Sequence, residues 1–373
     1  MKKVLAAAAL SSIFYFAFFI SASAQLTTTP NGGNKKAMIG ERIGLTDVTI
    51  HYDRPGVKGR DGKIWGTLIP VGYADQGFGN TKQAPWRAGA NESTTIEFST
   101  DVKIEGQDLA AGKYGFFIAY DPGECTLIFS KNSTSWGSFY YDPKEDVLRV
   151  KVKPVASDKI VEWLKYEFTH QTENSAVVEL QWEKLIIPFK IETDLDKIQL
   201  ATFRRELRTD KGFTWEAWQQ AAQWCVDKNT NLDEGLLWAD SATSANFAGD
   251  QSFSAWSTKA QVLDKLGRTA EAEEVMKKAI PYGSEVDLHI YARQLLAQKK
   301  NQQAFAVYKM NYDKHPNEFR TNMGMARGYS AIGNYKKALE FAQKAQPQAP
   351  DAPNKAVVDK AIKTLQDGKD INS

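Results

Sequence analysis

The sequence predicts a protein of two domains, an N-terminal antiparallel β-sandwich followed by an array of α-helical repeats, and so a fold of the all-β plus all-α class. Apolar residues alternate with polar ones at every second position before Leu195, which is the pattern of half-buried strands. After Leu195 they recur every three or four positions, which is the pattern of amphipathic helices. A chain of 373 residues is also too long for one ordinary core and suits two domains.

The N-terminus has the three parts of a secretory signal peptide. Lys2-Lys3 gives a basic start, residues 4–20 are almost entirely apolar, and Ala22-Ser23-Ala24 supplies a small-residue cleavage pattern. The alternative is an uncleaved anchor, but this apolar run is slightly shorter than the about 20 residues that cross a bilayer. We therefore expect residues 1–24 to be removed and the mature protein to be exported, to the periplasm or the extracellular space, without a membrane span.

Charge and cysteine content limit the classes of function. Loss of residues 1–24 removes two Lys and no acid, so the 47 basic residues become 45 and balance the 45 acidic ones. Nucleic-acid binding requires a basic excess, so we expect no nucleic-acid partner. Cys125 and Cys225 fall in different predicted domains. An oxidising compartment permits a disulfide, but two separately buried thiols are favoured.

The predicted β domain spans residues 38–194, after a polar stretch at 25–37 that is expected to form a flexible lead-in. The best-patterned strand is 94–104, where the alternation is unbroken. A hairpin is predicted around Asp121-Pro122-Gly123-Glu124, because Pro followed by Gly suits a type II turn. A second hairpin turns at residues 172–175, and the apolar phase of its return strand shifts, which requires a bulge or a tight turn.

Several motifs in this region match a known family. The block Trp-Arg-x-Gly-Ala-Asn-Glu at residues 86–92 is the most specific of them. The other matching segments are 48–55, 93–102, 109–115, 136–141 and Trp182-Glu183. Together, over about residues 38–192, they resemble the exported bacterial family called domain of unknown function 2911. The resemblance implies export and the limits of the domain, and it assigns no activity.

The region 195–373 carries small residues at nearly regular intervals. Ala272, Ala304 and Ala338 are 32 and 34 residues apart. This spacing resembles the tetratricopeptide repeat, whose period is 34 residues, whereas the alternative is a plain helical bundle. The clearest repeats span 252–350, and residues 352–366 are expected to form a terminal cap helix. Such arrays present a groove, so the resemblance implies a protein or peptide partner.

Two residues fix the expected register of the repeats. Thr269 and Asn334 each precede a helical pattern and offer a side-chain oxygen to the open amides at a helix start. Both are therefore predicted as N-caps.

The block at residues 86–92 also contains candidate ligand-binding residues. An aromatic face can pack a sugar ring or a peptide side chain, while Arg, Asn and Glu offer directional hydrogen bonds. The alternative, which is favoured, is structural: Trp86 fills the end of the sandwich, and an Arg87–Glu92 ion pair fixes the loop. Likewise, a salt bridge between Asp53 and Arg54 that anchors a strand end is preferred to a ligand contact. The full candidate set is Trp86, Arg87, Asn91, Glu92, Asp53 and Arg54.

A second candidate surface is the aromatic run at residues 136–141. It forms a binding face if its rings are exposed, whereas simple in-and-out alternation along a strand is the other explanation. A long loop between Pro70 and Pro85 lies upstream, and loops of this length in compact domains are usually functional or disordered. The aromatic residues of the run are Trp136, Phe139, Tyr140 and Tyr141.

No recognised motif for catalysis, metal binding or cofactor binding is present. The four histidines at positions 51, 170, 289 and 315 have no ligand spacing, and nucleophile and phosphate-loop motifs are missing. We therefore expect no catalytic residues, no metal and no cofactor. Catalytic groups can still be assembled from distant residues, so the sequence favours a non-enzyme without excluding an enzyme.

Three functions remain open, in order of preference. The first is an exported, non-catalytic binding or scaffold protein, with a β recognition module and a helical array that binds a protein or peptide. The second is an envelope glycan-binding or glycan-processing protein that uses the region Trp86 to Glu92. The third is a repeat-scaffolded enzyme with an unrecognised site.

Overall fold

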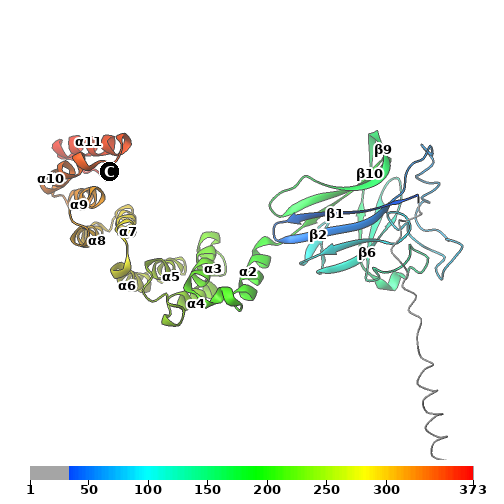
Figure 1. Ribbon diagram of the computed structural model, residues 1–373, viewed down its shortest axis with the longest axis horizontal. Coiled ribbons are helices and arrows are strands. Elements are labelled where there is room, and N and C mark those ends of the chain that lie inside the picture. Colours follow the sequence, from blue (N-terminus) through cyan, green and yellow to red (C-terminus); the bar gives the residue numbers. More distant parts are fainter. Residues whose placement is uncertain (1–32, 373) are drawn as a thin grey trace, which may run out of the picture. The chain divides into compact units, whose positions relative to one another are not determined.

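A computed structural model describes residues 33–372, and the chain divides into two compact units with a boundary between Ile198 and Gln199 (Figure 1). Strands build the first unit and helices build the second. The predicted signal peptide, residues 1–24, lies outside the described residues. None of the helices within residues 33–372 has the length and apolar character that a membrane crossing needs.

The β unit consists of two antiparallel sheets, a six-stranded sheet in the order β1-β2-β3-β6-β7-β8 and a four-stranded sheet in the order β5-β4-β10-β9. Side chains of both sheets, such as Phe116 and Trp182, are buried in one common core, which confirms the predicted sandwich. The strands are β1 (Lys35–Ile43), β2 (Thr46–Arg54), β3 (Thr94–Phe98), β4 (Val102–Ile104), β5 (Gln107–Leu109), β6 (Gly112–Ala119), β7 (Cys125–Ser130), β8 (Asp146–Val152), β9 (Val155–Thr169) and β10 (Ser175–Glu192).

Strand β1 begins at Lys35, inside the range 25–37 that the sequence assigns to a flexible lead-in. Its residues pair with β2 from Lys35 opposite Arg54 to Ile43 opposite Thr46. Because β1 is an edge strand, its polar side chains can face water while its backbone completes the ladder. Polar composition alone therefore does not reveal this strand.

The alternating segment 94–104 is divided between the two sheets, which corrects the prediction of one continuous strand. β3 pairs with β2 and β6 in the six-stranded sheet, whereas β4 pairs with β10 and β5 in the four-stranded sheet. Ile96, Phe98, Val102 and Ile104 are nevertheless all buried. The alternation continues across the corner because both sheets face the same core.

Two hairpins form where the sequence predicts them. β6 and β7 pair on either side of the turn at 121–124, and β9 and β10 pair on either side of residues 170–174. The register of β10 shifts on both sides of Glu183, whose φ of 52° is left-handed. This confirms the predicted irregularity, and it lets Trp182 and Ile187 both enter the core.

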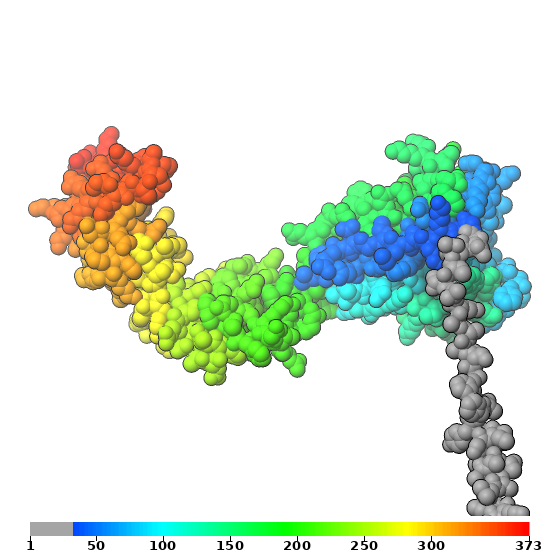
Figure 2. Space-filling view, in the orientation of Figure 1, coloured from blue at the N-terminus to red at the C-terminus, as the bar shows by residue number. Residues whose placement is uncertain are grey.

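The helical unit is a succession of helix pairs, which Figure 1 labels in chain order. Figure 2 shows the same part of the chain in space-filling form, coloured from green to red along the sequence. The first helices of three successive pairs begin at Phe253, Glu285 and Phe319, 32 and 34 residues apart, so the unit is a tetratricopeptide-like array. The helices are α2 (Leu195–Glu206), α3 (Trp215–Lys228), α4 (Leu232–Ala242), α5 (Phe253–Lys265), α6 (Thr269–Ala279), α7 (Glu285–Ala297), α8 (Asn301–Lys314), α9 (Phe319–Ala331), α10 (Tyr335–Ala345) and α11 (Ala352–Gln366).

Small residues and a final helix complete the array. Ala272, Ala304 and Ala338 are buried, so the paired helices approach closely at these positions. Val358 and Ala361 of α11 pack into one cluster with Met323 and Ala345 and cover the last apolar face, as a terminal cap does.

The two predicted N-caps have different outcomes. Asn334 caps α10, because its side chain accepts a hydrogen bond from the amide of Lys337 at 3.2 Å. Thr269 is instead the first residue of α6, and Arg268 occupies the cap position without a side-chain hydrogen bond. Both helices therefore begin where expected, but only one has the predicted cap.

Both cysteines are buried and unpaired, Cys125 in β7 and Cys225 in α3. Burial raises the pKa of both thiols, that of Cys225 to about 11. Neither thiol is therefore a reactive thiolate at neutral pH.

Candidate functional site

Two long loops meet at one end of the β-sandwich, the loop 55–93 between β2 and β3 and the loop 131–145 between β7 and β8. The amide of Asn80 donates to the carbonyl of Phe139 at 3.1 Å. Closer to β3, the Ser93 hydroxyl donates to the carbonyl of Gly137 at 2.6 Å. The loops thus hold one another, and both predicted candidate surfaces lie on them.

Trp86 is a core residue. It is only 9% exposed, its ring stacks on Trp182 at 6.1 Å, and its indole N–H donates to the carbonyl of Gly89 at 3.0 Å. The structural alternative therefore describes Trp86, and its face is not open to a sugar ring.

Arg87 holds the two loops together, and it does not form the expected ion pair with Glu92. Its Nη1 donates to the carbonyl of Asn91 at 2.6 Å, and its guanidinium lies 4.9 Å from the centroid of the Phe139 ring. A Cβ at Gly137 would lie 2.2 Å from the Arg87 Cζ, so glycine is required where the guanidinium packs. Burial lowers the pKa of Arg87.

Glu92 pairs with a residue that the sequence analysis did not consider. Both of its carboxylate oxygens lie 2.7 Å from the Nζ of Lys36 on β1. Nearby, the amide of Asn34 donates to the Asn91 side chain at 3.3 Å. The edge strand thus covers the 86–92 block and supplies a cation to it.

Asp53 and Arg54 point to different places and do not form the predicted salt bridge. Arg54 donates from Nε to the carbonyl of Leu164 at 2.7 Å and so fastens β2 to β9. By alternation, Asp53 belongs to the outward-facing side of β2. It is nevertheless only 3% exposed, because Gly89 and its neighbours cover it. Asp53 lines a pocket.

The Asp53 pocket is a polar hollow of about 740 Å³. Strand pairing assembles it, because His51 lies opposite Thr95 and carries the pocket from β2 to β3. Its rim carries Trp136, which is 57% exposed. The lining residues are Lys36, Ala37, Met38, His51, Tyr52, Asp53, Glu92, Ser93, Thr95, Lys113, Ser133, Thr134, Ser135 and Trp136.

The carboxyl group of Asp53 is incompletely satisfied. Its Oδ1 is buried and has no hydrogen-bond partner within the described chain. Burial raises the pKa of Asp53, whereas the Asn91 side chain and the charge of Lys36 lower it. A buried acceptor without a partner is costly, so a ligand hydroxyl or amine that donates to Oδ1 would be favoured.

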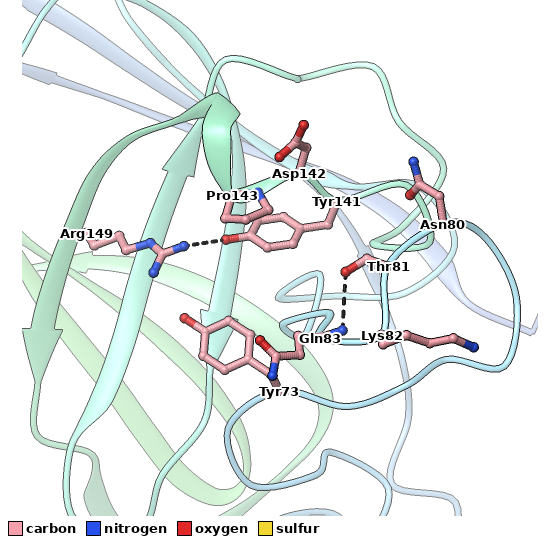
Figure 3. A pocket seen from close by; sticks show the side chains of 9 residues that line it. All are labelled: Tyr73, Asn80, Thr81, Lys82, Gln83, Tyr141, Asp142, Pro143 and Arg149. Atoms are coloured by element: carbon pink, nitrogen blue, oxygen red, sulfur yellow. Dashed lines mark hydrogen bonds between the residues drawn. The ribbon is translucent and has the colours of Figure 1, made fainter.

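A second hollow, of about 590 Å³, lies between the same two loops (Figure 3). Tyr141 donates to Asp146 Oδ2 at 2.6 Å, and Arg149 donates to the same oxygen at 2.7 Å. Burial and this hydrogen bond raise the pKa of Tyr141. In Figure 3, the side chains of Tyr73 and Arg149 lie on one side of the hollow and that of Lys82 lies on the other. The lining residues are Tyr73, Asn80, Thr81, Lys82, Gln83, Tyr141, Asp142, Pro143 and Arg149.

The aromatic run at 136–141 is partly exposed. Trp136 and Tyr140 are exposed, whereas Tyr141 is buried against Phe117 at 5.5 Å. Phe78, from the other loop, is exposed and lies 5.5 Å from Phe139. The run therefore contributes both core and surface rings at this end of the sandwich.

The Asp53 pocket brings together groups that can bind a polar ligand. Asp53, His51 and Glu92 share the pocket, but no hydrogen bond links them as a nucleophile and its base. Within residues 33–372, no group of three His, Cys, Asp or Glu side chains could hold a metal ion. What the pocket offers is hydroxyls, paired charges, one unsatisfied carboxyl oxygen and an indole face.

The helical unit has a groove of its own, about 220 Å³, between α5, α6 and α7. Glutamine side chains of α5 and α7, Gln261, Gln294 and Gln298, line it together with Tyr291. Each amide offers both a donor and an acceptor, which is what an extended peptide backbone needs. The repeat spacing predicts a groove in the array, but it does not reveal these glutamines or Tyr291.

The β unit is similar to a known family. Residues 34–191 match the model of a family described as "Protein of unknown function (DUF2911)". The chain thus joins a domain similar to this family to a tetratricopeptide-like helical array, as the sequence motifs predict. No curated protein matches the chain.

Solved structures of repeat proteins are similar to part of the chain. One is MamA, residues 41 to the end, from Desulfovibrio magneticus RS-1, with 15% identity and a TM-score of 0.29 over 43% of this chain and 95% of that one. Another is YrrB, titled a TPR protein with an unusual peptide-binding site, with 13% identity and a TM-score of 0.32 over 46% and 88%. A third is a Podosopora anserina putative kinesin light chain with TPR-like repeats, with 13% identity and a TM-score of 0.33 over 43% and 89%.

Proposed function

We propose that this is an exported, non-catalytic binding protein whose helical array holds a segment of a partner protein and whose β unit carries a separate recognition pocket. The observation that carries the proposal is the groove between α5, α6 and α7. Stacked helix pairs expose a continuous surface to partners, and here that surface contains amide side chains beside an aromatic ring.

Site-specific photo-cross-linking in the full-length mature chain tests this proposal. A benzophenone side chain at Gln294, in the groove, should capture a protein or peptide from the native extract at stoichiometric yield. The same group at Lys360, exposed on α11 and outside the groove, is the matched control. Equal capture at both positions, or none at Gln294, contradicts the proposal.

A second candidate function, glycan binding, is favoured by the Asp53 pocket. Its exposed Trp136 offers a face for a sugar ring, and Asp53 Oδ1 offers an acceptor for a sugar hydroxyl. Trp136, and not Trp86, is therefore the candidate ring for sugar binding, because Trp86 is buried. On a glycan array, Trp136→Ala and Asp53→Ala should each lose any glycan that the parent retains, whereas Tyr140→Ala should retain it. Retention by all three variants argues against this candidate.

Export is part of the proposal, and the N-terminal sequence supports it. The basic start, apolar run and small-residue pattern within residues 1–24 are those of a cleaved signal peptide. N-terminal sequencing of the protein recovered from the exported fraction should begin at Gln25. A chain that keeps Met1 and stays with the cytoplasm contradicts export.

A further inference from the structure

The carboxyl group of Asp53 is buried but has no cationic partner. The residue is 3% exposed, and its Oδ1 makes no hydrogen bond within the described chain. Within residues 33–372, no basic side chain forms an ion pair with this carboxyl group. An aspartate is rarely buried to this extent without such a partner. A cation that enters the pocket would therefore supply what the chain itself does not.

The basic residue whose charge acts on Asp53 is Lys36, and Lys36 is already paired with Glu92. Lys36 lies opposite Asp53 in the ladder of β1 and β2, yet its Nζ lies 2.7 Å from both carboxylate oxygens of Glu92. Burial raises the pKa of Asp53, the Asn91 side chain and the charge of Lys36 lower it, and the charge of Glu92 raises it. Two carboxylates thus share one ammonium, so the ionised cluster has an excess negative charge.

Trp136 places an aromatic face at the rim of the same pocket, where it is 57% exposed. The carbonyl of its neighbour Ser135 accepts a hydrogen bond from the amide of Ser93 at 3.2 Å, which holds this part of the loop beside the residue that follows Glu92. An indole face attracts a cation, and it also packs the apolar face of a sugar ring. The rim therefore favours a ring that carries a positive charge.

Much of the remaining lining carries hydroxyl groups, each of which can donate and accept a hydrogen bond. Such a lining suits a ligand that has several hydroxyls of its own, as a sugar has. The volume of about 740 Å³ is also within the usual range of small-molecule pockets. The hydroxyl-bearing residues are Ser93, Thr95, Ser133, Thr134 and Ser135.

Lys113 gives the pocket a second, positively charged end. Glu97 lies opposite Thr49 on β2 and opposite Lys113 on β6, so Lys113 is two strands and four residues away from Asp53. With strands about 4.8 Å apart and a rise of about 3.3 Å per residue, the two Cα atoms are roughly 16 Å apart. Because Lys113 is exposed, salt screens its charge over such a distance, so it opposes a cation at Asp53 only weakly. It does disfavour a second positive charge at its own end.

We propose that the Asp53 pocket binds a sugar that carries a free amino group, with the ammonium at Asp53 and the ring against Trp136. The inference rests on the glycan-binding candidate above, and it names the class of glycan. A hydroxyl would donate to Oδ1 without neutralising the carboxylate, whereas an ammonium also gains the attraction between opposite charges, which is screened little at a buried site. A metal ion does not meet the same need, because within the described residues no three His, Cys, Asp or Glu side chains could hold one.

NMR titration of the mature full-length chain with three methyl glycosides tests the inference. The glycosides of glucosamine, N-acetylglucosamine and glucose share one ring and differ at one position, and only the first is cationic when its amine is protonated. The indole N–H signal of Trp136, assigned from the spectrum of Trp136→Phe, reports on the pocket itself. The glucosamine derivative should bind at least about tenfold more tightly than the other two, because only it forms an ion pair with the buried carboxylate.

Asp53→Asn separates the charge of this residue from its hydrogen bonding. The amide keeps an acceptor but loses the charge, so the preference for the glucosamine derivative should disappear while the neutral glycosides bind as before. Asp158→Asn, which removes an exposed carboxylate on β9 outside the pocket, is the matched control and should keep the full preference. Circular dichroism checks that both variants are folded.

The ion pair of Lys36 and Glu92 supplies a test of sign. Glu92→Gln leaves the Lys36 charge without its partner, so it should weaken binding of the glucosamine derivative about threefold. Lys36→Gln leaves the Glu92 carboxylate free, so it should strengthen that binding by about the same factor. Neither change should alter the affinity for methyl glucoside by more than about twofold. Changes in the same direction for all three glycosides would show a purely structural role of the pair and overturn the inference.

The outcomes separate this inference from the glycan-binding candidate. Equal binding of the three glycosides that is lost in Trp136→Ala and Asp53→Ala overturns the inference and leaves the candidate standing. An unchanged preference in Asp53→Asn overturns the inference, and so does binding of none of the three glycosides. Ethanolamine that binds as tightly as the glucosamine derivative overturns the sugar class. The glycan array then decides by itself whether the candidate survives.

Discussion

At the scale of single residues, Asp53 shows how burial sets a pH dependence. Burial raises the pKa of Asp53, so the folded protein holds this proton to a higher pH than the unfolded chain does. The stabilisation that the proton provides is complete below the ordinary pKa of Asp and is lost as the pH rises through the raised folded value. The charged carboxylate is therefore a cost at neutral pH.

Asp53→Asn should raise the free energy of unfolding at pH 7 by about 1 kcal/mol, because the amide resembles the protonated acid. At pH 3.5 the same change should have almost no effect. Urea unfolding of the β unit at both pH values measures the difference, and Asp108→Asn, on exposed β5, is the control. An equal effect of Asp53→Asn at the two pH values contradicts the assignment.

His289 should produce the opposite dependence on pH. Its pKa falls from an ordinary 6.5 to about 4 in the folded protein, so the neutral ring stabilises the fold above pH 6.5. That stabilisation is lost as the pH falls from 6.5 towards 4. In the parent chain, the free energy of unfolding should fall by on the order of 2 kcal/mol between pH 6.5 and pH 4. In His289→Gln, unfolding measurements should show a much smaller fall over the same pH range.

At the scale of elements, two glycines of α9 permit different degrees of close packing. A Cβ at Gly324 would lie 2.7 Å from the Tyr308 ring, whereas one at Gly328 would lie 3.1 Å from the Phe305 ring. Both changes to Ala gain helix propensity of about 1 kcal/mol.

Gly324→Ala should therefore destabilise the helical unit by about 2 kcal/mol, since the buried Tyr308 must move. Gly328→Ala, on the same helix with the same gain in propensity, should cost less. Thermal unfolding followed by circular dichroism ranks the two. A smaller loss for Gly324→Ala than for Gly328→Ala would show that α8 and α9 pack less closely than described.

The two predicted caps give a second comparison at this scale. Asn334→Ala should cost about 1 kcal/mol, because the amide of Lys337 loses its partner at the start of α10. Thr269→Ala should be nearly neutral, since Thr269 makes no cap bond and is the first residue of α6. Chemical denaturation of both variants measures the two losses in the free energy of unfolding. Equal losses would mean that Thr269 caps its helix in solution.

Secondary-structure elements could be predicted from the sequence where one face is buried and the other is exposed to solvent. Alternation in β9 and β10 determines which side chains enter the core, so the hairpin and its irregularity at Glu183 follow from the sequence. Strand β1 was missed because its core-facing side is weakly apolar: Ala37 and Ile39 are only partly buried, and only Ile43 is fully buried. The division of 94–104 into β3 and β4 was missed because both sheets bury the same set of alternate residues.

At the scale of the whole molecule, the repeat period could be predicted from the sequence, but the sets of residues that form the sites could not. The Asp53 pocket joins Lys36, His51 and Lys113, which come from β1, β2 and β6. Their proximity depends on the order of strands in the sheet, which alternation does not reveal.

Loop contacts were the least predictable feature. The sequence pairs Arg87 with Glu92 because they are close in the chain and opposite in charge. The fold instead directs Arg87 to Asn91 and Phe139, and it brings Lys36 across from another strand to Glu92. Tertiary neighbours decide such pairs, and a single sequence does not show them.

The central claim is that the helical array, and not the β unit alone, engages a partner. Hydrogen exchange measured on the full-length mature protein with and without its captured partner tests this most directly. We predict that slowed exchange concentrates in α5, α6 and α7, which line the groove, with unchanged exchange in β9 and β10. Protection confined to the loops around Asp53, or no protection within the helices, would contradict the account.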